Sequence, residues 1–310
     1  MNSPRKTING AIDKVVGYYL RNYRKMVFLP IIFVIFFSIS IGYHYFTTGQ
    51  VVNEDISLAG GISISLTTSQ SVSPSLIVSN LTSALGTQVS VSVLHATLSN
   101  AITGYTITAG TSVTPTELSN AVSKLFGINL TSSNSNIDFV GASLAQGALS
   151  DSIFLLSIAF ILVAIVSLFY FRNFAQAFSN VISIISDVIN VVGLLDLLGL
   201  SFSTASIAGI LMIMGYSADR NIILATNILK RKEAEMKYRL VHTIKTSLTM
   251  DAAALATFLV LLFGTSNAII QSIAIILIFG VIFDDFTVWI LNGSIQLAAI
   301  KYKEETKQTV

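Results

Sequence analysis

Residues 203–229 read STASIAGILMIMGYSADRNIILATNIL, an apolar stretch that carries Asp219 and Arg220 side by side. The stretch exceeds the roughly 20 residues that a helix needs to cross a bilayer. A carboxylate in hydrocarbon costs about 2.5–3.5 kcal/mol even on lenient insertion scales, and a chain this apolar could have carried Leu there. Charged groups within a spanning helix therefore indicate a path for ions or protons, or a buried polar lock between helices.

The composition of the whole chain agrees with this first stretch. The 310 residues are 53% hydrophobic and 11% charged, whereas soluble proteins have roughly 25% charged residues. The sequence therefore predicts an integral membrane protein. We expect spans at 26–46, 152–171, 175–198, 203–229, 243–263 and 268–292. The chain has no Cys and three scattered His, so we expect no metal site and no cofactor.

The spans divide the chain into five parts. The Ser- and Thr-rich segment between the first two spans is too polar for the membrane and too long for a loop, so we expect it to form a domain. The predicted parts are an N-terminus (1–25), a first transmembrane helix (26–46), an inserted α+β domain (47–150), a five-helix transmembrane region (151–292) and a C-terminal tail (293–310).

The distribution of Lys and Arg predicts the orientation. Positive residues gather on the cytoplasmic side of membrane proteins. If all six spans are real, fifteen of the 18 Lys and Arg residues fall on the side of the two termini, and the other side has Lys124. We therefore expect a plasma-membrane protein with both termini in the cytoplasm and residues 47–150 outside. The sequons at Asn80 and Asn129 lie on the outer side, and the sequence does not decide whether they are glycosylated.

The inserted domain shows a readable order of elements. Apolar residues alternate with polar ones at 62–66 and 89–93, as in half-buried strands, and further strands are expected at 105–108 and 137–140. Ser73-Pro74 and Thr114-Pro115 open two helices that run to about Leu85 and Phe126, the second with a capping box to Glu117. The order β-α-β-β-α-β is that of ferredoxin-like domains.

Several acids share a level within the predicted bundle. At 1.5 Å per residue, Asp219 lies about 24 Å from the outer end of its span, Asp284 lies about as deep, and Asp251 lies about 12 Å from the inner end of its span. A carboxyl placed between desolvation and a nearby cation can take up and release protons near neutral pH. Two further candidates are Asp187, near mid-depth, and Asp285.

Arg220 and Lys245 are the possible counter-charges for these acids. Arg220 follows Asp219 directly, so it points about 100° away around the helix and needs another partner. Purely structural roles for these acids stay open. Asp219 could form a static salt bridge, and Asp284 and Asp285 could be solvated helix ends. Asp196 is expected to be a solvated end residue. No nucleotide-binding or hydrolase motif is present, so any work must draw on an ion gradient or on another protein.

Five short motifs in order resemble the SecF family, whose members pair with SecD in the SecDF complex of the RND superfamily. They span residues 26–292 and include Ser186-Asp187-Val188 in the third span. The other family-motif positions are Asp55, Gly60 and Gly61 after the first span, Gly141 and Ser143 before the second, Gly215, Tyr216 and Ser217 in the fourth, and Thr246, Ser247 and Thr249 in the fifth. The motifs depart from the family pattern at several positions, and in this the chain resembles archaeal members of the family.

The resemblance implies a fold, a role and a set of partners. The fold would be an RND/SecDF-type bundle of six transmembrane helices with one extracytoplasmic ferredoxin-like domain between the first and second. The chain would be a non-enzymatic subunit that acts with SecD and the SecY translocon on a translocating polypeptide, in the lipid bilayer and without nucleic acid. On this reading Asp219 is the titrating acid, Lys245 stands at the family's Arg, and Asp187 is the matching acid of the third span.

Two other functions remain open at this stage. A small-molecule exporter of the RND class would need a second six-helix half and usually two large outer domains in its chain, whereas this chain has one of each. A scaffold that stabilises SecD and SecY, with the acids serving as helix locks, cannot be separated from the proton-driven function by sequence.

Overall fold

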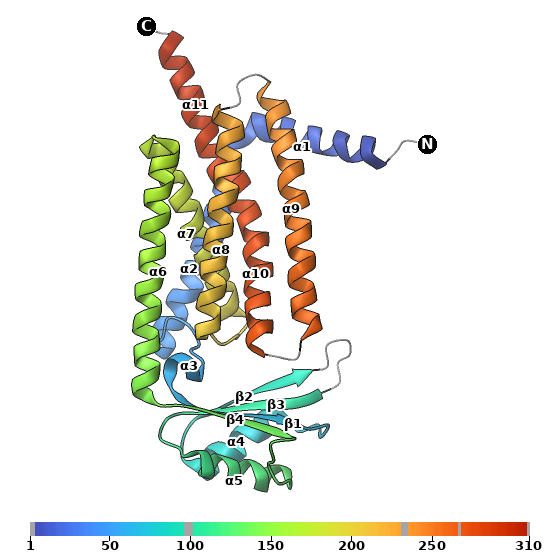
Figure 1. Cartoon of the computed structure of the whole chain (residues 1–310), viewed down its shortest axis with the longest axis vertical. Helices are drawn as coiled ribbons and strands as arrows, with labels where there is room; N and C mark the ends of the chain where they lie inside the picture. Colours follow the sequence, from blue (N-terminus) through green and yellow to red (C-terminus); the bar gives the residue numbers. More distant parts are fainter. Residues whose placement is uncertain (1–3, 96–101, 231–234, 266–267, 309–310) are drawn as a thin grey trace. The chain divides into compact units, whose positions relative to one another are not determined.

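The computed structural model describes residues 4–95, 102–230, 235–265 and 268–308. The chain forms two compact units (Figure 1). The helical unit comprises Met1–Val52, Leu155–Leu200 and Ala205–Val310, and the sheet unit comprises Asn53–Phe154 and Ser201–Thr204. Arg231 and Lys232, which contribute to the predicted orientation, lie outside the described residues.

Within the described ranges, six helices are long and apolar enough to cross a membrane, which confirms the predicted number. They are built from α2 (Phe28–Thr48), α6 (Ala142–Phe171), α7 (Phe174–Leu197), α8 (Thr204–Ala225), α9 (Met236–Gly264) and α10 (Ala268–Phe286). A π-helical turn, η1 (Thr226–Lys230), extends α8, and a second, η2 (Thr287–Asn292), continues α10 into α11 (Gly293–Gln308). Arg239 Nη1 donates to the Ile228 carbonyl at 2.7 Å, which satisfies a backbone acceptor in η1.

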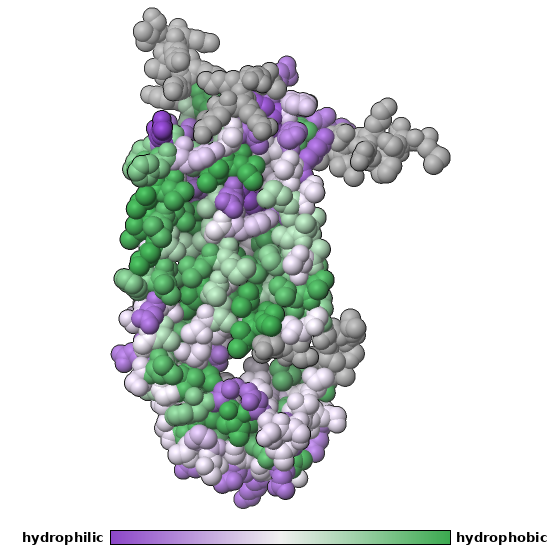
Figure 2. All heavy atoms as spheres, viewed as in Figure 1, coloured by the Kyte–Doolittle hydropathy of each residue, from purple (hydrophilic) through white to green (hydrophobic). Residues whose placement is uncertain are grey.

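The six spans differ in how much of their surface the chain itself covers. About half of the most apolar stretch is buried in α7 (56%), in α8 (50%) and in the α10–η2–α11 span (50%), against 11% in each of α2, α6 and α9. Figure 2 shows hydrophobic side chains over the surface of these helices. The three better covered spans are those with most of the buried polar residues, because ionisable side chains within a membrane face the bundle interior.

The predicted N-terminal segment is itself helical, which the sequence analysis did not anticipate. Helix α1 (Pro4–Met26) buries Val16, Tyr19 and Tyr23 against α8, α9 and η2, and leaves Tyr18 59% exposed. The three buried positions follow the spacing of one helix face. Tyr19 Oη lies 3.3 Å from Ser294 Oγ, in the space left by the absent side chain of Gly293.

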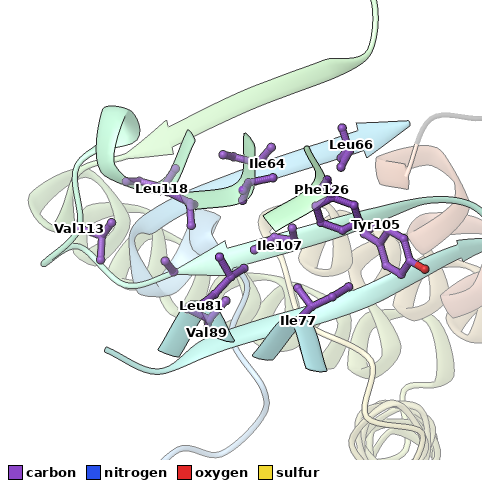
Figure 3. Close-up of a cluster of buried hydrophobic side chains, with 13 residues drawn as sticks. Ile64, Leu66, Ile77, Leu81, Val89, Tyr105, Ile107, Val113, Leu118 and Phe126 are labelled. Atoms are coloured by element: carbon purple, nitrogen blue, oxygen red, sulfur yellow. The ribbon is translucent and has the colours of Figure 1, made fainter. Parts of the chain in front are cut away.

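The sheet unit has the predicted ferredoxin-like order. Four antiparallel strands, β1 (Gly61–Thr67), β2 (Val89–His95), β3 (Ile102–Ala109) and β4 (Ser135–Val140), lie in the order β2-β3-β1-β4. Helices α4 (Pro74–Leu85) and α5 (Pro115–Phe126) contribute Ile77, Leu81, Leu118, Val122 and Phe126 to one core with the sheet (Figure 3). The alternation of Ile62, Ile64 and Leu66 places all three in this core, fully buried.

Both predicted helix starts are confirmed, with Ser73 and Thr114 at the N-cap positions, and they differ in whether the capping side chain bonds to the helix. Thr114 and Glu117 form the expected capping box at α5. Ser73 occupies the N-cap position of α4, but its hydroxyl lies 2.8 Å from Ser75 Oγ and makes no cap bond.

The loop after α7 is held by the short helix α3 (Ile56–Ala59) and the residues before it, all within the sheet unit. Phe202 N donates to the Asn53 carbonyl at 2.6 Å, and Asp55 N donates to the Phe202 carbonyl at 2.8 Å. Thr204 N donates to Ser57 Oγ at 3.1 Å, at the first residue of α8. Two backbone hydrogen bonds and one bond to a side-chain hydroxyl therefore satisfy polar backbone groups just ahead of α8.

Candidate functional site

The helical unit contains a buried ion cluster centred on Arg220 of α8. Arg220 Nη1 lies 2.7 Å from Asp284 Oδ2 and 3.1 Å from Asp251 Oδ1. Nη2 pairs with Asp285 Oδ1 and donates to Ser247 Oγ at 2.7 Å. The side chains of Arg220, Asp251 and Asp284 are 2%, 4% and 0% exposed, and that of Asp285 is 29% exposed. One cation therefore faces three carboxyls contributed by two other helices.

Hydroxyl groups complete the coordination of Asp251. Tyr216, one helical turn before Arg220, donates its hydroxyl to Asp251 Oδ1 at 2.7 Å. Ser247 Oγ reaches Asp251 Oδ2 at 3.4 Å from the preceding turn of α9. The Arg220 guanidinium carbon also lies 5.6 Å from the Tyr216 ring centroid, within the range of a cation–π interaction. The family-motif residues Tyr216 and Ser247 are thus part of the cluster.

A fourth acid, Asp187 of α7, faces Asp284 from the other side. Ser217 donates to Asp187 Oδ2 at 2.7 Å, and Thr287 donates to Asp187 Oδ1. The Asp187 and Asp284 carboxyls are both 0% exposed and lie within hydrogen-bonding reach of each other. Neither Asp284 oxygen has a well-aligned donor among the described groups. A hydrogen bond between two carboxyls requires a proton on one of them.

The charge of this cluster is the central feature of its electrostatics. With all four carboxyls ionised, Arg220 and its acids would carry a net charge of −3. Buried ionised groups are stable only when they are paired. The lowest-energy arrangement in an apolar bundle therefore includes at least one protonated carboxyl, and two carboxyls that face each other share such a proton readily.

A chain of buried amides and hydroxyls continues from Asp187 toward α11. Asn221 Nδ2 lies 3.3 Å from Ser217 Oγ, and Asn292 Nδ2 donates to Asn221 Oδ1. Ser179 Oγ and Gln296 Nε2 then donate to Asn292 Oδ1 at 2.5 and 3.0 Å. Asn221, Asn292 and Gln296 are fully buried, so polar atoms run continuously through the interior of the helical unit.

A small cavity lies beside Arg220 on the α9 side. It has a volume of about 10 Å³, and its lining includes Thr243, Ser247 and Trp289. That volume suits about one water molecule. Arg220 Nε and Trp289 Nε1 are both buried donors without a partner among the described groups.

The structure brings together most of the predicted site residues. Asp187, Arg220, Asp251, Asp284 and Asp285 meet in one cluster, although Asp284 and Asp285 had the alternative of being solvated helix ends. As the residue spacing required, Arg220 diverges from Asp219.

Two predicted site residues lie outside the cluster. Asp219 is exposed on the surface of α8, and Lys245 is half-buried on α9. No ion pair joins either to another described residue. Asp196, expected to be a solvated end residue, is instead buried and paired with His44.

The remaining family-motif positions are mostly structural. Gly61 has φ +138°, and a Cβ there would lie 2.4 Å from the Ala109 carbonyl oxygen, so only glycine fits this strand start. Asp55 is the N-cap of α3 and accepts from Ile56 N at 2.7 Å; burial raises the pKa of its carboxyl. The other such positions, Gly60, Gly141, Ser143, Gly215, Thr246 and Thr249, make no contact with the ion cluster in the described contacts.

Sequence reasoning missed the uncharged members of the site. Thr287, Asn221, Asn292 and Ser179 carry no charge, and single Ser, Thr or Asn residues are common within membrane helices. A usable signal is the spacing of the polar residues of α7, because Asn180, Ser183, Asp187 and Asn190 recur at intervals of three and four and are all buried. No group of His, Cys, Asp and Glu in the described residues could hold a metal ion.

Comparison with known proteins agrees with the fold and the motifs. The sequence model of "Protein export membrane protein SecD/SecF, C-terminal" matches residues 120–302. The chain is 30% identical over 281 residues to the protein-export membrane protein SecF of Pyrococcus furiosus, covering 91% of this chain and 92% of that one. It is 29% identical over 288 residues to SecF of Methanothermobacter thermautotrophicus, with coverages of 91% and 92%.

A solved structure shows the same fold. The crystal structure of SecDF from Thermus thermophilus, a translocon-associated membrane protein, superposes with a TM-score of 0.71 at 17% sequence identity. The match covers 92% of this chain and 38% of the SecDF chain. With a family match over more than half of its length and a near-complete relative at 30% identity, this chain belongs to the SecF family of protein-export membrane proteins.

Proposed function

We propose that the chain is a SecF-like subunit that acts with SecD to promote protein export through the SecY translocon, driven by the proton gradient. The supporting observation is the buried cluster in which Arg220 faces three carboxyls and a fourth, that of Asp187, faces Asp284. Both termini would lie in the cytoplasm, and residues 47–150 would lie outside and meet the translocating polypeptide. The excess of Lys and Arg at the termini supports this orientation.

Protonation changes which carboxyls Arg220 must neutralise. A proton that arrives on Asp284 weakens its ion pair with Arg220 and leaves the guanidinium to Asp251 and Asp285. The members of the cluster come from α7, α8, α9 and α10, so a change of pairing alters contacts among four helices at once. A buried packed cluster has a small number of discrete arrangements. Proton binding favours the arrangement that binds the proton more tightly, by an amount set by the difference in proton affinity between the arrangements.

The exposed side chain of Asp219 supports a partner within the membrane. Asp219 lies within the span Thr204–Ile228 but faces away from its own bundle. Facing lipid, its carboxylate would cost about 2.5–3.5 kcal/mol. The surface of α8 around Asp219 is therefore the proposed contact with SecD, which would place a donor or cation against this carboxylate.

The test is gradient-dependent export by vesicles that contain this chain, SecD and SecY. Asp187→Asn keeps one oxygen that can accept from Ser217 or Thr287, and its amide nitrogen can donate to the other hydroxyl, but it removes the shared proton. We expect the variant to assemble normally and to lose the part of export that responds to an imposed proton gradient. Asp151→Asn, the same change at an exposed position of α6, is the matched control and should export like the wild type.

A scaffold function is the second candidate, supported by the dense pairing around Arg220, which would also lock four helices together. Under this function Asp187→Asn would reduce co-purification with SecD, and the assembled fraction would still respond to the gradient. Normal assembly with an unchanged gradient response would reject proton coupling through Asp187.

A further inference from the structure

A second pair of titratable groups joins α2 to α7, apart from the Arg220 cluster. His44 Nδ1 lies 2.9 Å from Asp196 Oδ1, and Ser40 donates to Asp196 Oδ2 at 3.5 Å. The side chains of His44 and Asp196 are 14% and 4% exposed. A carboxylate this buried requires a compensating partner, and His44 supplies it.

The pair leaves two buried atoms without a hydrogen-bond partner. His44 Nε2 and Asp196 Oδ1 both lack one among the described groups, although His44 Nδ1 lies 2.9 Å from Asp196 Oδ1. A proton bound by the imidazole forms an imidazolium beside the carboxylate, so the charge of the pair changes from −1 to 0.

Other titratable groups on the neighbouring elements lie away from this pair. Helices α1 and α7 and the turn η2 pack against α2, as do aromatic rings of α10. Tyr43 and Tyr45 of α2 are 71% and 51% exposed, and η2 carries no ionisable residue. On α7, Asp187 is nine residues from Asp196, about 14 Å along the helix.

The charged groups of the two other elements are also distant along the helices. Asp284 and Asp285 of α10 belong to the Arg220 cluster. The described ionisable residues of α1 lie before α2 begins, so they are at the end of α2 opposite His44; they are Asp13, Lys14, Tyr18, Tyr19, Arg21, Tyr23, Arg24 and Lys25. Helix α11 also packs on α7, and its residues 293–300 carry no ionisable side chain. Among the side chains that the structure describes, no third charge is found beside His44 and Asp196.

An aromatic contact separates this pair from the inner cluster. Phe37 of α2 packs directly on Gly193 of α7, where a Cβ would lie 2.5 Å from the Phe37 Cβ. The Phe37 ring also packs edge-on against Phe283 of α10, with centroids 5.4 Å apart. Beyond this contact α7 presents Asn190, whose buried Oδ1 has no partner among the described groups, and then Asp187.

We propose that His44 and Asp196 form a proton-binding site at the outer end of the helix bundle, separated by Phe37 from the Asp187–Asp284 pair that the proton reaches next. This inference rests on the proposed proton coupling, because it supplies the uptake step for the same path. The ligand is a proton from the outer solution, received by the His44 imidazole and balanced by the Asp196 carboxylate.

The first test is the protonation state of His44 in the full chain, held in lipid nanodiscs with SecD. The chain has three His, so loss of one ring ¹⁵N signal in His44→Gln assigns the residue. We expect acidification of the buffer to convert the His44 ring from the neutral form to the imidazolium while its contact with Asp196 is kept. A ring that stays in one state throughout overturns the inference.

The second test is proton uptake by vesicles after an acid pulse outside. His44→Gln should slow uptake by about 10²-fold, the contribution of a positioned proton-transfer group. His242→Gln, the same change at an exposed position of α9, should leave uptake unchanged. Uptake at the wild-type rate in His44→Gln overturns the inference alone. Absence of uptake in the wild type refutes the proposed proton coupling instead, and the ¹⁵N titration then decides the outer site.

Discussion

Replacing Arg220 by Gln tests the electrostatics of the cluster most severely. At an effective dielectric constant of about 20, Coulomb's law gives about 6 kcal/mol of attraction at the 2.7 Å contact with Asp284 and about 5 kcal/mol at the 3.1 Å contact with Asp251. Desolvation offsets much of this, and removing one partner of a buried pair costs about 3–5 kcal/mol. We therefore expect Arg220→Gln to destabilise the folded protein by about 3–5 kcal/mol at pH 7.5.

The same variant should acquire a characteristic pH dependence. Without Arg220, the unpaired carboxyls can lose their charge by taking up protons. For an Asp with an ordinary pKa, protonation at pH 7.5 costs about 5 kcal/mol, which is close to the cost of breaking the buried pair. The folded variant then binds more protons than its unfolded chain, so its stability falls as pH rises, by about 1.4 kcal/mol per pH unit for each extra proton. Acidification should partly rescue it.

The assay is the unfolding of the detergent-solubilised full chain between about pH 5 and 8, compared with the wild type under matched conditions. Lys245→Gln is the control, because it removes a nearby cation that pairs with no described carboxylate; it should change stability by less than about 0.5 kcal/mol. A loss below about 1 kcal/mol in Arg220→Gln, with an unchanged pH profile, would refute the idea that Arg220 compensates buried carboxylates.

Three further variants probe other parts of the molecule. Gly193→Ala should lower stability by about 1–3 kcal/mol through overpacking. Adding Phe37→Gly, which removes the Cβ that the new methyl group meets, should remove that clash penalty in a double-mutant cycle of unfolding midpoints; strictly additive losses would contradict the close contact. Asn292→Ala leaves Asn221 and its neighbours without buried partners, so unfolding should show a loss of about 1–3 kcal/mol, and no loss would show that water replaces the amide. The pKa of Asp55 is higher in the folded protein than in the unfolded chain, so its contribution to stability is fully present below about pH 3.9 and is lost as pH rises through the folded-state pKa. Asp55→Asn, which can still cap α3, should flatten that part of the pH dependence of stability, measured by hydrogen exchange of β1. An unaltered pH dependence would show that other groups cause it.

The elements of the fold could be predicted because each has a strong local cause. Length and hydropathy alone indicate the six spans. The alternation of Ile62, Ile64 and Leu66 and the Thr114–Glu117 capping box define a strand and a helix start without reference to the rest of the chain. Helix α1 was missed because only three of its described residues are buried, and because its stability depends on tertiary contacts with α8 and α9.

The site could be predicted only in part, because helical geometry fixes relative and not absolute directions. Consecutive residues diverge by about 100°, so the sequence shows that Asp219 and Arg220 face different ways but not which of them faces the interior. The structure buries Arg220 and exposes Asp219. The pair of His44 and Asp196 escaped notice for a related reason, since its members lie in different spans and each also fits a solvated helix end.

The proton shared by Asp187 and Asp284 is the central claim, and infrared difference spectroscopy tests it directly on the full chain. A protonated carboxyl absorbs apart from a carboxylate, so the wild type at neutral pH should show a buried protonated-carboxyl band. That band should disappear in both Asp187→Asn and Asp284→Asn and persist in Asp219→Asn. A wild-type spectrum without a protonated carboxyl at neutral pH, or a band that survives both cluster substitutions, would contradict the account.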